Sequence, residues 1–262
     1  MAFRLITLNL NGIRSAASKG FVEWAALAAA DCMGVQEVKA QQADVAGRFD
    51  TVAGLQGHFH FAEKKGYSGV GIYTRKTPSA VIIGLGDAAF DAEGRYVETR
   101  FDTAKRKFSV ISCYFPSGSS GEDRQAAKFR FLDIVYPHLL ALKAEREYIL
   151  VGDINIAHQQ IDLKNWRSNQ KNSGFLPGER NWMTRLLEEA GLVDVFRTLN
   201  PHPEQYTWWS NRGQARANNV GWRLDYHLAT PGIAATAKRE AIYLDQRFSD
   251  HAPLTIDYDF TI

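Results

Sequence analysis

The sequence predicts an α/β protein in which two β-sheets pack together and helices cover them on the outside. Short β-rich runs recur along the whole chain and are mixed with three segments of helical spacing. The runs 149–151 and 111–113 are apolar on both faces, as expected for central strands that are covered on each side. Two packed sheets with outer helices satisfy this pattern.

The expected strands are short runs that are mostly separated by Gly, Asp, Asn or Pro clusters. They are Phe3–Leu10, Ser68–Thr74, Tyr96–Phe101, Lys107–Phe115, Tyr148–Ile156, Arg223–Leu228 and Pro253–Phe260. Helical spacing predicts helices over Lys19–Ala30, Glu122–Ala144 and Glu179–Ala190, and Gly191 is placed to end the last of them. The polar segments 165–178 and 210–219 are expected to be long surface loops, which are often functional.

Composition indicates one ordinary folded domain over residues 1–262. Apolar residues make up 45% and charged residues 23% of the chain, and no linker, low-complexity tract or charge block marks a boundary. The net charge of +2 gives no general attraction to a polyanion. Any nucleic-acid surface must therefore be a local patch.

The two cysteines, Cys32 and Cys113, lack the spacing of a disulfide framework or a zinc site. The first residues do not have the pattern of a secretory signal, and no apolar run is long enough to span a bilayer. We therefore expect a cytoplasmic protein without a membrane partner.

Carboxylates and amides cluster where the expected strands end. Oxygen ligands of this kind suit a hard cation such as Mg²⁺, which keeps open water positions for a phosphate. Taken singly, each residue is more often a turn residue or a helix cap. The set is Asn9, Asn11, Glu37, Asp153, Asn155, Asp225, Asp250 and His251.

The segment Gly152–Asn155 is the most informative of these strand ends. Asp153 and Asn155 follow a wholly apolar strand at positions i and i+2, so strand alternation would point both side chains into one site. An acid that positions or deprotonates water, beside an amide that donates to a phosphate oxygen, is what phosphodiester hydrolysis requires. The alternative is an ordinary turn.

The segment Ser249–Pro253 places His251 beside Asp250, just before the last expected strand. A single histidine here is compatible with a surface or capping role. In a phosphate site it would hold a non-bridging oxygen, while Asp225 fixes its tautomer through the other ring nitrogen.

Six segments occur in order along nearly the whole chain, and together they resemble the motifs of exonuclease III-type apurinic/apyrimidinic (AP) endonucleases of the endonuclease/exonuclease/phosphatase superfamily. Short motifs match by chance, but six in order with chemically suitable residues do not. They are LeuAsnLeuAsnGly at 8–12, GlnGlu at 36–37, GlyTyrSerGlyValGly at 66–71, GlyAspIleAsnIle at 152–156, GlyTrpArgLeuAspTyr at 221–226 and SerAspHisAlaPro at 249–253.

The resemblance implies a four-layer α/β sandwich, with two packed mixed sheets flanked by helices and the site at one edge of the sheets. It implies Mg²⁺, with Mn²⁺ as a substitute, held by Glu37 as the principal ligand together with Asn9, Asp153, Asn155 and Asp250. It also implies the catalytic residues. Asp153 would orient or activate the attacking water, and Asn155 would hold the scissile phosphate. His251, paired with Asp225, would stabilise the developing negative charge, and Tyr114 would contact the phosphate or assist the leaving group. Lys39 would brace Glu37.

The implied reaction is metal-dependent hydrolysis on the 5′ side of an abasic site in double-stranded DNA, leaving a 3′-hydroxyl, together with processing of blocked 3′ ends. A dedicated 3′-phosphatase or 3′–5′ exonuclease is the alternative within the same chemistry. A catalytically silent DNA-binding protein is disfavoured by the intact catalytic set, and a lipid-cleaving relative by the lack of an apolar membrane-facing loop. The acting form is expected to be a monomer.

The resemblance also assigns substrate contacts. Trp208, Trp222 and Leu224 match a tight apolar pocket that would accept a flipped-out abasic sugar. The small side chain of Ser173 would leave room for this sugar. The loop 116–121 carries small residues where some relatives carry Asn and Arg. The remaining matches to substrate-binding positions are Asn11, where some relatives have Asp, and Gly66, Tyr67, Asn165, Asn169 and Arg212.

Overall fold

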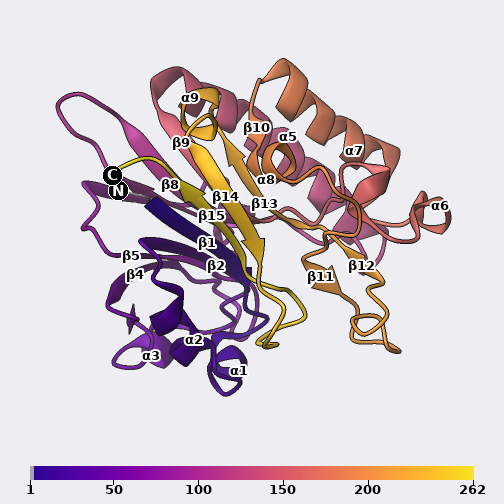
Figure 1. The fold of residues 1–262 in the computed structure, drawn as a ribbon, viewed down its shortest axis with the longest axis horizontal. Helices are drawn as coiled ribbons and strands as arrows, with labels where there is room; N and C mark the ends of the chain where they lie inside the picture. Colours follow the sequence, from indigo (N-terminus) through magenta and orange to yellow (C-terminus); the bar gives the residue numbers. More distant parts are fainter. Residues whose placement is uncertain (1–2) are drawn as a thin grey trace.

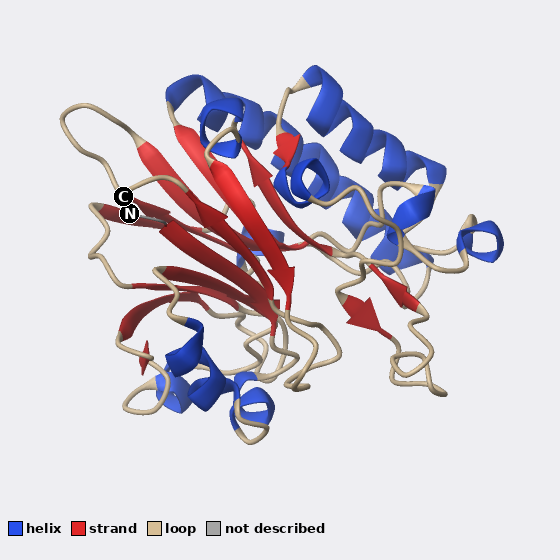
Figure 2. Cartoon of the chain, in the orientation of Figure 1, coloured by secondary structure: helices blue, strands red, loops and turns tan. Residues whose placement is uncertain are grey.

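The computed structural model describes residues 3–262, and its strands form two packed mixed sheets that helices cover on the outer faces (Figures 1 and 2). The α/β sandwich expected from the sequence is confirmed. One sheet has the order β14 (Ala237–Ile242), β15 (Leu254–Tyr258), β1 (Phe3–Asn9), β2 (Cys32–Gln36), β5 (Val70–Thr74), β4 (Leu55–His60) and β3 (Thr51–Val52). The other has the order β10 (Val193–Asp194), β13 (Asp225–Ala229), β9 (Glu147–Asp153), β8 (Phe108–Tyr114), β7 (Tyr96–Arg100) and β6 (Ala80–Ile83).

Helices of very different length complete the layers. In Figure 1, α1 (Ile13–Ala17), α2 (Phe21–Ala28) and α3 (Gln42–Val45) lie outside the first sheet, and α5 (Glu122–Glu145) and α7 (Pro177–Thr184) lie outside the second. A π-helical turn, Arg185–Glu189, continues α7. The short elements are α4 (Ala88–Asp91), α6 (Trp166–Asn169), α8 (Val195–Leu199), α9 (Pro231–Ala234), a 3₁₀ turn at Gln160–Asp162, and the ribbon of β11 (Trp208–Trp209) and β12 (Gly221–Trp222).

Three large apolar clusters fill the spaces between the layers, and strand β9 contributes to two of them. Leu150 packs in the cluster under α5 and α7, whereas Ile149 and Val151 pack between the sheets. The third cluster lies between the first sheet and α1 to α3. Because successive side chains of a strand point to opposite faces, a strand that is buried on both faces must be apolar throughout.

Two parallel strand pairs bring the functional strand ends to the same edge. β1 pairs with β2 in parallel, and β8 pairs with β9 in parallel. The antiparallel partner β13 starts where β9 ends, so Asp225 lies opposite Asp153 in the register. The turns that follow β1, β2, β8 and β9 therefore meet in one place.

The expected elements agree with the structure in their interiors and differ at their ends. All seven expected runs contain a strand, but the run 148–156 stops pairing at Asp153. The expected helix Glu179–Ala190 starts two residues earlier, at Pro177, and its second half is π-helical. The segment 165–178 is not purely a loop, because it contains α6 and the start of α7. Gly191 adopts a positive φ of 65°, as expected for the residue that ends a helix.

Membrane-spanning helices were also sought among residues 3–262. None of the helices there is both long and apolar enough to cross a bilayer.

Candidate active site

A cavity of about 220 Å³ opens at the edge where β1, β2, β8 and β9 end. Most of the residues with an expected catalytic role line it, and they come from segments spread over the whole chain. The lining residues are Glu37, Tyr114, Ser117, Ser119, Asp153, Asn155, Ser173, Gly174, Trp208, Trp222, Leu224, Asp250 and His251.

Glu37 lies at one side of the cavity, in a network of amides and one ammonium group. Lys39 Nζ lies 2.7 Å from Glu37 Oε2, and it also donates to Asn11 Oδ1 at 2.6 Å. Burial raises the pKa of Glu37, but Lys39 and the amide of Asn9 outweigh burial and lower it. Glu37 is therefore a carboxylate at neutral pH, and Lys39 braces it as expected.

Asn9 links the two principal acids of the cavity. Its Nδ2 donates to Glu37 Oε1 at 2.8 Å and to Asp153 Oδ2 at 2.9 Å, while its Oδ1 accepts the backbone N–H of Asn11. In this arrangement Asn9 is a bridge between carboxylates. Asn9 would have to turn its amide to offer the oxygen to a metal ion.

Asp153 and Asn155 meet, although not by the strand alternation that the sequence suggested. Asn155 has a φ of 55°, so the chain leaves the extended conformation directly after β9. The Asp153 side chain accepts the backbone N–H of Asn155 at 2.9 Å and its Nδ2 at 3.2 Å. Both side chains line the same cavity, but the geometric reason was wrong: an aspartate-capped turn replaces the pleat.

Gly152 makes this turn possible. Its φ of 147° lies in the region that favours glycine, and a Cβ atom there would lie 1.9 Å from the carbonyl oxygen of Cys113. The neighbouring strand β8 thus approaches β9 too closely for any side chain at this position.

His251 and Asp225 form a buried pair beside Asp153. His251 Nδ1 lies 2.8 Å from Asp225 Oδ2, and Nε2 lies 3.7 Å from Asp153 Oδ2. Burial disfavours the charged imidazole, but Asp225 and Asp153 outweigh burial and raise the pKa of His251. Burial raises the pKa of Asp153, and the negative charges of Asp225 and Glu37 raise it further against the opposing effect of His251.

The same group of residues can hold a metal ion. One ligand atom from each of Asp153, Asp225 and His251 lies within 4.8 Å of the others. This cluster shares Asp153 with the expected ligand set, whereas Glu37 and Asp250 lie elsewhere on the cavity lining. Asp250 is tied by Asn11 Nδ2 at 2.9 Å and by Trp208 Nε1 at 3.1 Å.

Aromatic side chains form the apolar wall of the cavity. Trp208 and Trp222 pair across the ribbon of β11 and β12, with ring centroids 6.4 Å apart in an edge-to-face arrangement. Leu224 completes this wall, whereas Trp209 is buried in a separate apolar cluster, as composition alone suggests. Thr207, which sequence reasoning missed, accepts the backbone N–H groups of both Leu224 and Asp225 through its Oγ1.

Small residues form another part of the cavity lining, and Gly174 lies close to the Trp222 ring. The small residues are Ser117, Ser119, Ser173 and Gly174. A second cavity of about 640 Å³ continues past Ser119, Ser173 and Trp208 and includes exposed Arg212. The site is therefore open toward the loop 116–121.

Several expected substrate contacts do not line the catalytic cavity. Gly66 and Asn165 are exposed, and Asn169 donates to the backbone oxygen of Asn165 at 2.8 Å within α6. Figure 1 shows α6 projecting from the body of the protein. Tyr67 is half-buried, and its hydroxyl group accepts hydrogen bonds from Arg95 and Arg124.

Arg95 is a second residue that the sequence did not reveal. Its guanidinium group lies 4.8 Å from the ring centre of Tyr114 and donates to the Tyr114 backbone oxygen at 3.1 Å. Burial raises the pKa of Tyr114 well above its usual value, and the acids Glu37 and Asp153 raise it further. The phenol therefore keeps its proton.

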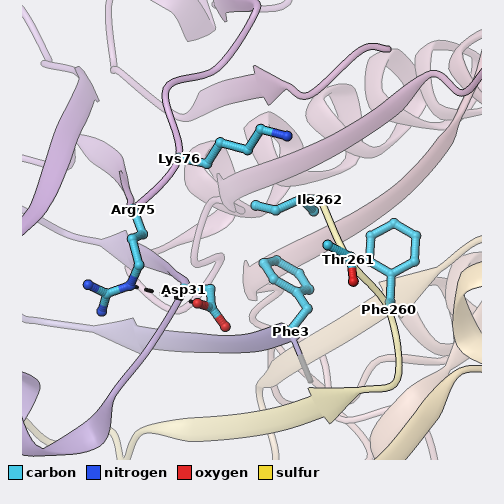
Figure 3. A pocket seen from close by; sticks show the side chains of 7 residues that line it. All are labelled: Phe3, Asp31, Arg75, Lys76, Phe260, Thr261 and Ile262. Atoms are coloured by element: carbon cyan, nitrogen blue, oxygen red, sulfur yellow. Dashed lines mark ion pairs between the residues drawn. The ribbon is translucent and has the colours of Figure 1, made fainter. Parts of the chain in front are cut away.

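A larger cavity, of about 320 Å³, lies beside the chain termini (Figure 3). Phe3, Phe260 and Ile262 supply its apolar lining, and its charged groups are the pair Asp31–Arg75, at 3.7 Å, and Lys76. Its lining lacks the carboxylate and imidazole set that hydrolysis needs. Chemistry rather than volume identifies the smaller cavity as the active-site candidate.

Comparison with known proteins agrees with this choice. The model of the endonuclease/exonuclease/phosphatase family matches residues 6–251. The chain is 35% identical to an exodeoxyribonuclease of Bacillus subtilis over 97% of this chain and 98% of the relative. It is 34% identical to a DNA-(apurinic or apyrimidinic site) endonuclease of Dictyostelium discoideum, over 98% of this chain and 70% of that relative. An AP endonuclease structure from Leishmania major superposes with a TM-score of 0.89 at 26% identity, covering 99% of this chain and 88% of that one.

Proposed function

Because the chain belongs to the endonuclease/exonuclease/phosphatase family, we propose that it is a DNA-repair AP endonuclease that also processes blocked 3′ ends. It is a nuclease of that family. The observation that carries the proposal is the cavity that Glu37, Asp153, Asn155 and His251 line together with Trp208 and Trp222. The substrate is double-stranded DNA with an abasic site, and the cut falls on its 5′ side.

The donor set fits Mg²⁺, with Mn²⁺ as a substitute. Glu37, Asp153 and Asp250 offer carboxylate oxygens, which hard divalent cations prefer. Asn9 and Asn155 would complete the set through their amide oxygens. The chemistry supplied by such a cation is neutralisation of negative charge on the phosphate.

Asp153 is proposed to orient and deprotonate the attacking water. A general base works best when its pKa is near the working pH, and burial together with Asp225 and Glu37 raises the pKa of Asp153 toward that range. Asn9 and Asn155 donate to its oxygen Oδ2, which fixes the carboxylate plane. The water attacks phosphorus directly, so a covalent enzyme intermediate is not needed.

The imidazole of His251 and two neutral polar side chains face the position proposed for the phosphate. His251, held by Asp225, presents Nε2 toward the cavity and stabilises the developing negative charge. Asn155 contributes its amide, and the protonated phenol of Tyr114 contacts the phosphate or the leaving oxygen. Preorganised donors of this kind typically account for about 10²–10³-fold of the rate each.

The lining of the cavity favours cleavage at an abasic site over an activity that is restricted to 3′ ends. Trp208, Trp222 and Leu224 give the cavity an apolar part, and the small side chain of Ser173 in the same lining would leave room for a sugar inside a continuous strand. Asn11, Gly66, Tyr67, Asn165, Asn169 and Arg212 are proposed to contact the flanking DNA. Contacts to phosphates set the register of the duplex without reading its sequence.

The experiment that tests this function compares three duplexes in the presence of Mg²⁺. One carries a single abasic analogue, one a 3′-phosphate and one a recessed 3′ end. We expect efficient incision on the 5′ side of the analogue and none after EDTA treatment. Trimming of 3′ ends without abasic incision would establish the alternative enzyme, and tight binding without any cleavage would refute an enzymatic role.

A substitution at Ser173 sharpens the choice between the two activities. A bulky imidazole in Ser173→His should obstruct an internal abasic sugar and leave access for a strand end. We expect abasic incision to fall by about 10²-fold, with the rate on the 3′-phosphate duplex changed much less. Ser120→His is a matched control, because Ser120 is exposed and does not line the cavity.

We propose that the protein acts in the cytoplasm as a monomer with a single domain. Strand β1 from the start of the chain lies between β2 and β15, so segments from both ends of the chain belong to one sheet. Cys32 and Cys113 are both free and buried. Free thiols are compatible with a reducing compartment.

A further inference from the structure

A fully buried ion pair lies behind the active site and joins α5 to α7, two helices that cover the second sheet. Lys128 of α5 and Glu179 of α7 are 2.6 Å apart, and neither side chain is exposed at all. Removing two charges from water is expensive, and well-packed apolar residues stabilise a core at least as well. Stability alone therefore does not explain why this ion pair is present.

The lysine end of this pair reaches the catalytic turn. Lys128 Nζ donates to the backbone oxygen of Asn155 at 2.7 Å. Asn155 has a left-handed backbone conformation, with a φ of 55°, which a residue other than glycine holds only when its surroundings enforce it. The amide of Asn155 also donates to Phe115 O at 3.0 Å, so the residue is fixed from both sides.

The glutamate end of the pair fixes the small-residue wall. Glu179 Oε2 accepts the backbone N–H groups of Gly174 at 2.7 Å and Leu176 at 2.9 Å. Gly174 has a φ of 91°, and a Cβ atom there would lie 3.2 Å from the Trp222 ring. The Glu179 carboxylate thus holds Gly174 in place beside the Trp222 ring.

We propose that Lys128 and Glu179 are positioning residues that hold the phosphate-binding turn at Asn155 and the pocket wall at Ser173–Gly174 in one fixed relation. This inference rests on the proposed function, because it assigns the pair to the same substrate site. Lys128 acts on the reacting phosphate through Asn155, and Glu179 acts on substrate fit through Gly174. Neither residue lines the catalytic cavity.

The competing explanation is that the pair only joins α5 to α7. A second lysine of α5 offers a matched control for this explanation. Lys143 Nζ donates to the backbone oxygens of Ala190 at 2.5 Å and Gly191 at 3.2 Å, so it also caps carbonyls beyond α7. It has no contact with the catalytic cavity.

The test measures Tm together with kcat and KM on the abasic duplex for Lys128→Met, Glu179→Gln, the double variant and Lys143→Met. Each single variant of the pair leaves one buried charge uncompensated, so we expect Tm to fall by about 10 °C. Removing both charges together should restore Tm to within about 3 °C of the wild type. Lys143→Met should lower Tm slightly and leave kcat unchanged.

Activity separates positioning from stability. In the double variant the Asn155 oxygen still lacks its donor, so kcat should remain reduced by about 10²-fold while KM changes little. Recovery of kcat together with Tm in the double variant would show that the pair is only structural. An equal loss of kcat in Lys143→Met would overturn the inference as well.

Failure of this inference is distinguishable from failure of the proposed function. If the wild type does not incise the abasic duplex, the proposed function fails, and the same variants are then compared on the 3′-phosphate duplex. The positioning role predicts the kcat loss on that substrate too, because both reactions place a phosphate at Asn155. Unchanged kcat there would refute the inference.

Discussion

One segment, residues 221–225, contributes to two buried groups of charges that differ in their balance. Arg223 points into the first group, where it pairs with Asp162 at 2.8 Å and with Asp194 at 2.7 Å. Arg197 pairs with Asp162 as well, at 2.7 Å. Two acids thus face two arginines, and these cations outweigh burial and lower the pKa of Asp162 to about 2.

Asp225 points into the second group, which is the active site. There Glu37, Asp153, Asp225 and Asp250 face His251 and Lys39, so acids outnumber cations. Oδ1 of Asp225 has no hydrogen-bond partner among the residues that the structure describes. Burial and neighbouring acids raise the pKa of Asp153, which is opposite to the shift at Asp162.

The difference shows what each group is for. In the first group each charge already has its partners, and none of these residues lines the catalytic cavity, so its role is in the fold. An unbalanced group stores unfavourable negative charge that a bound divalent cation would relieve, which is a common property of functional sites. Changes to the first group should therefore alter stability, and changes to the second should alter activity.

The largest effect is expected from Arg223→Met. This substitution leaves Asp162 and Asp194 buried with fewer cations, so we expect the free energy of unfolding to fall by about 3–5 kcal/mol. Urea unfolding followed by circular dichroism measures it. Arg212→Met is the control and should change stability by less than about 0.5 kcal/mol, because Arg212 is exposed. A loss below about 1 kcal/mol in Arg223→Met would contradict a structural role for the first group.

A smaller effect, and one on activity, is expected from Asp225→Asn. The amide cannot stabilise a charged His251, so the donor aimed at the phosphate weakens. We expect kcat to fall by about 10–100-fold, while the free energy of unfolding stays close to that of the wild type. Steady-state incision of the abasic duplex gives kcat. Loss of folding with unchanged kcat per folded molecule would place Asp225 in the structural group instead.

Acid should protonate Asp162 of the first group only after most surface carboxylates have taken up their protons. The pKa of Asp162 in the folded protein is about 2, below its usual value of 3.8. Its pairing therefore contributes stability above about pH 4 and loses it as the pH falls through about 2, by about 2 kcal/mol in total. Unfolding free energies of the wild type and Asp162→Asn between pH 2 and 5 measure this. Equal slopes in the two proteins would contradict the assigned shift.

The sequence predicted the layers because they depend on local patterns, whereas the catalytic set came from the family resemblance and stays a prediction. The apolar run 149–151 specifies a strand covered on both faces, and Asp153 follows from where that strand stops. The turn at Asn155 could not be predicted, because its left-handed conformation depends on Lys128 and on the close approach of Cys113 to Gly152.

The residues that contact the site from other parts of the chain could not be predicted from the sequence either. Arg95 contacts the site through Tyr114, and Thr207 contacts it through Leu224. In both pairs the two residues are well separated along the chain. Lys128 is a charged residue among the buried side chains of α5. Such a residue must have a partner, but the sequence does not say which one.

The most direct test of the account combines activity and stability in one variant, Asp153→Asn. The amide removes a charge from the unbalanced group, so we expect abasic incision to fall by about 10³-fold or more, while DNA binding is largely kept. The free energy of unfolding should rise by about 1 kcal/mol. A variant that loses stability together with activity, or one that still turns over at the wild-type rate, would contradict the account.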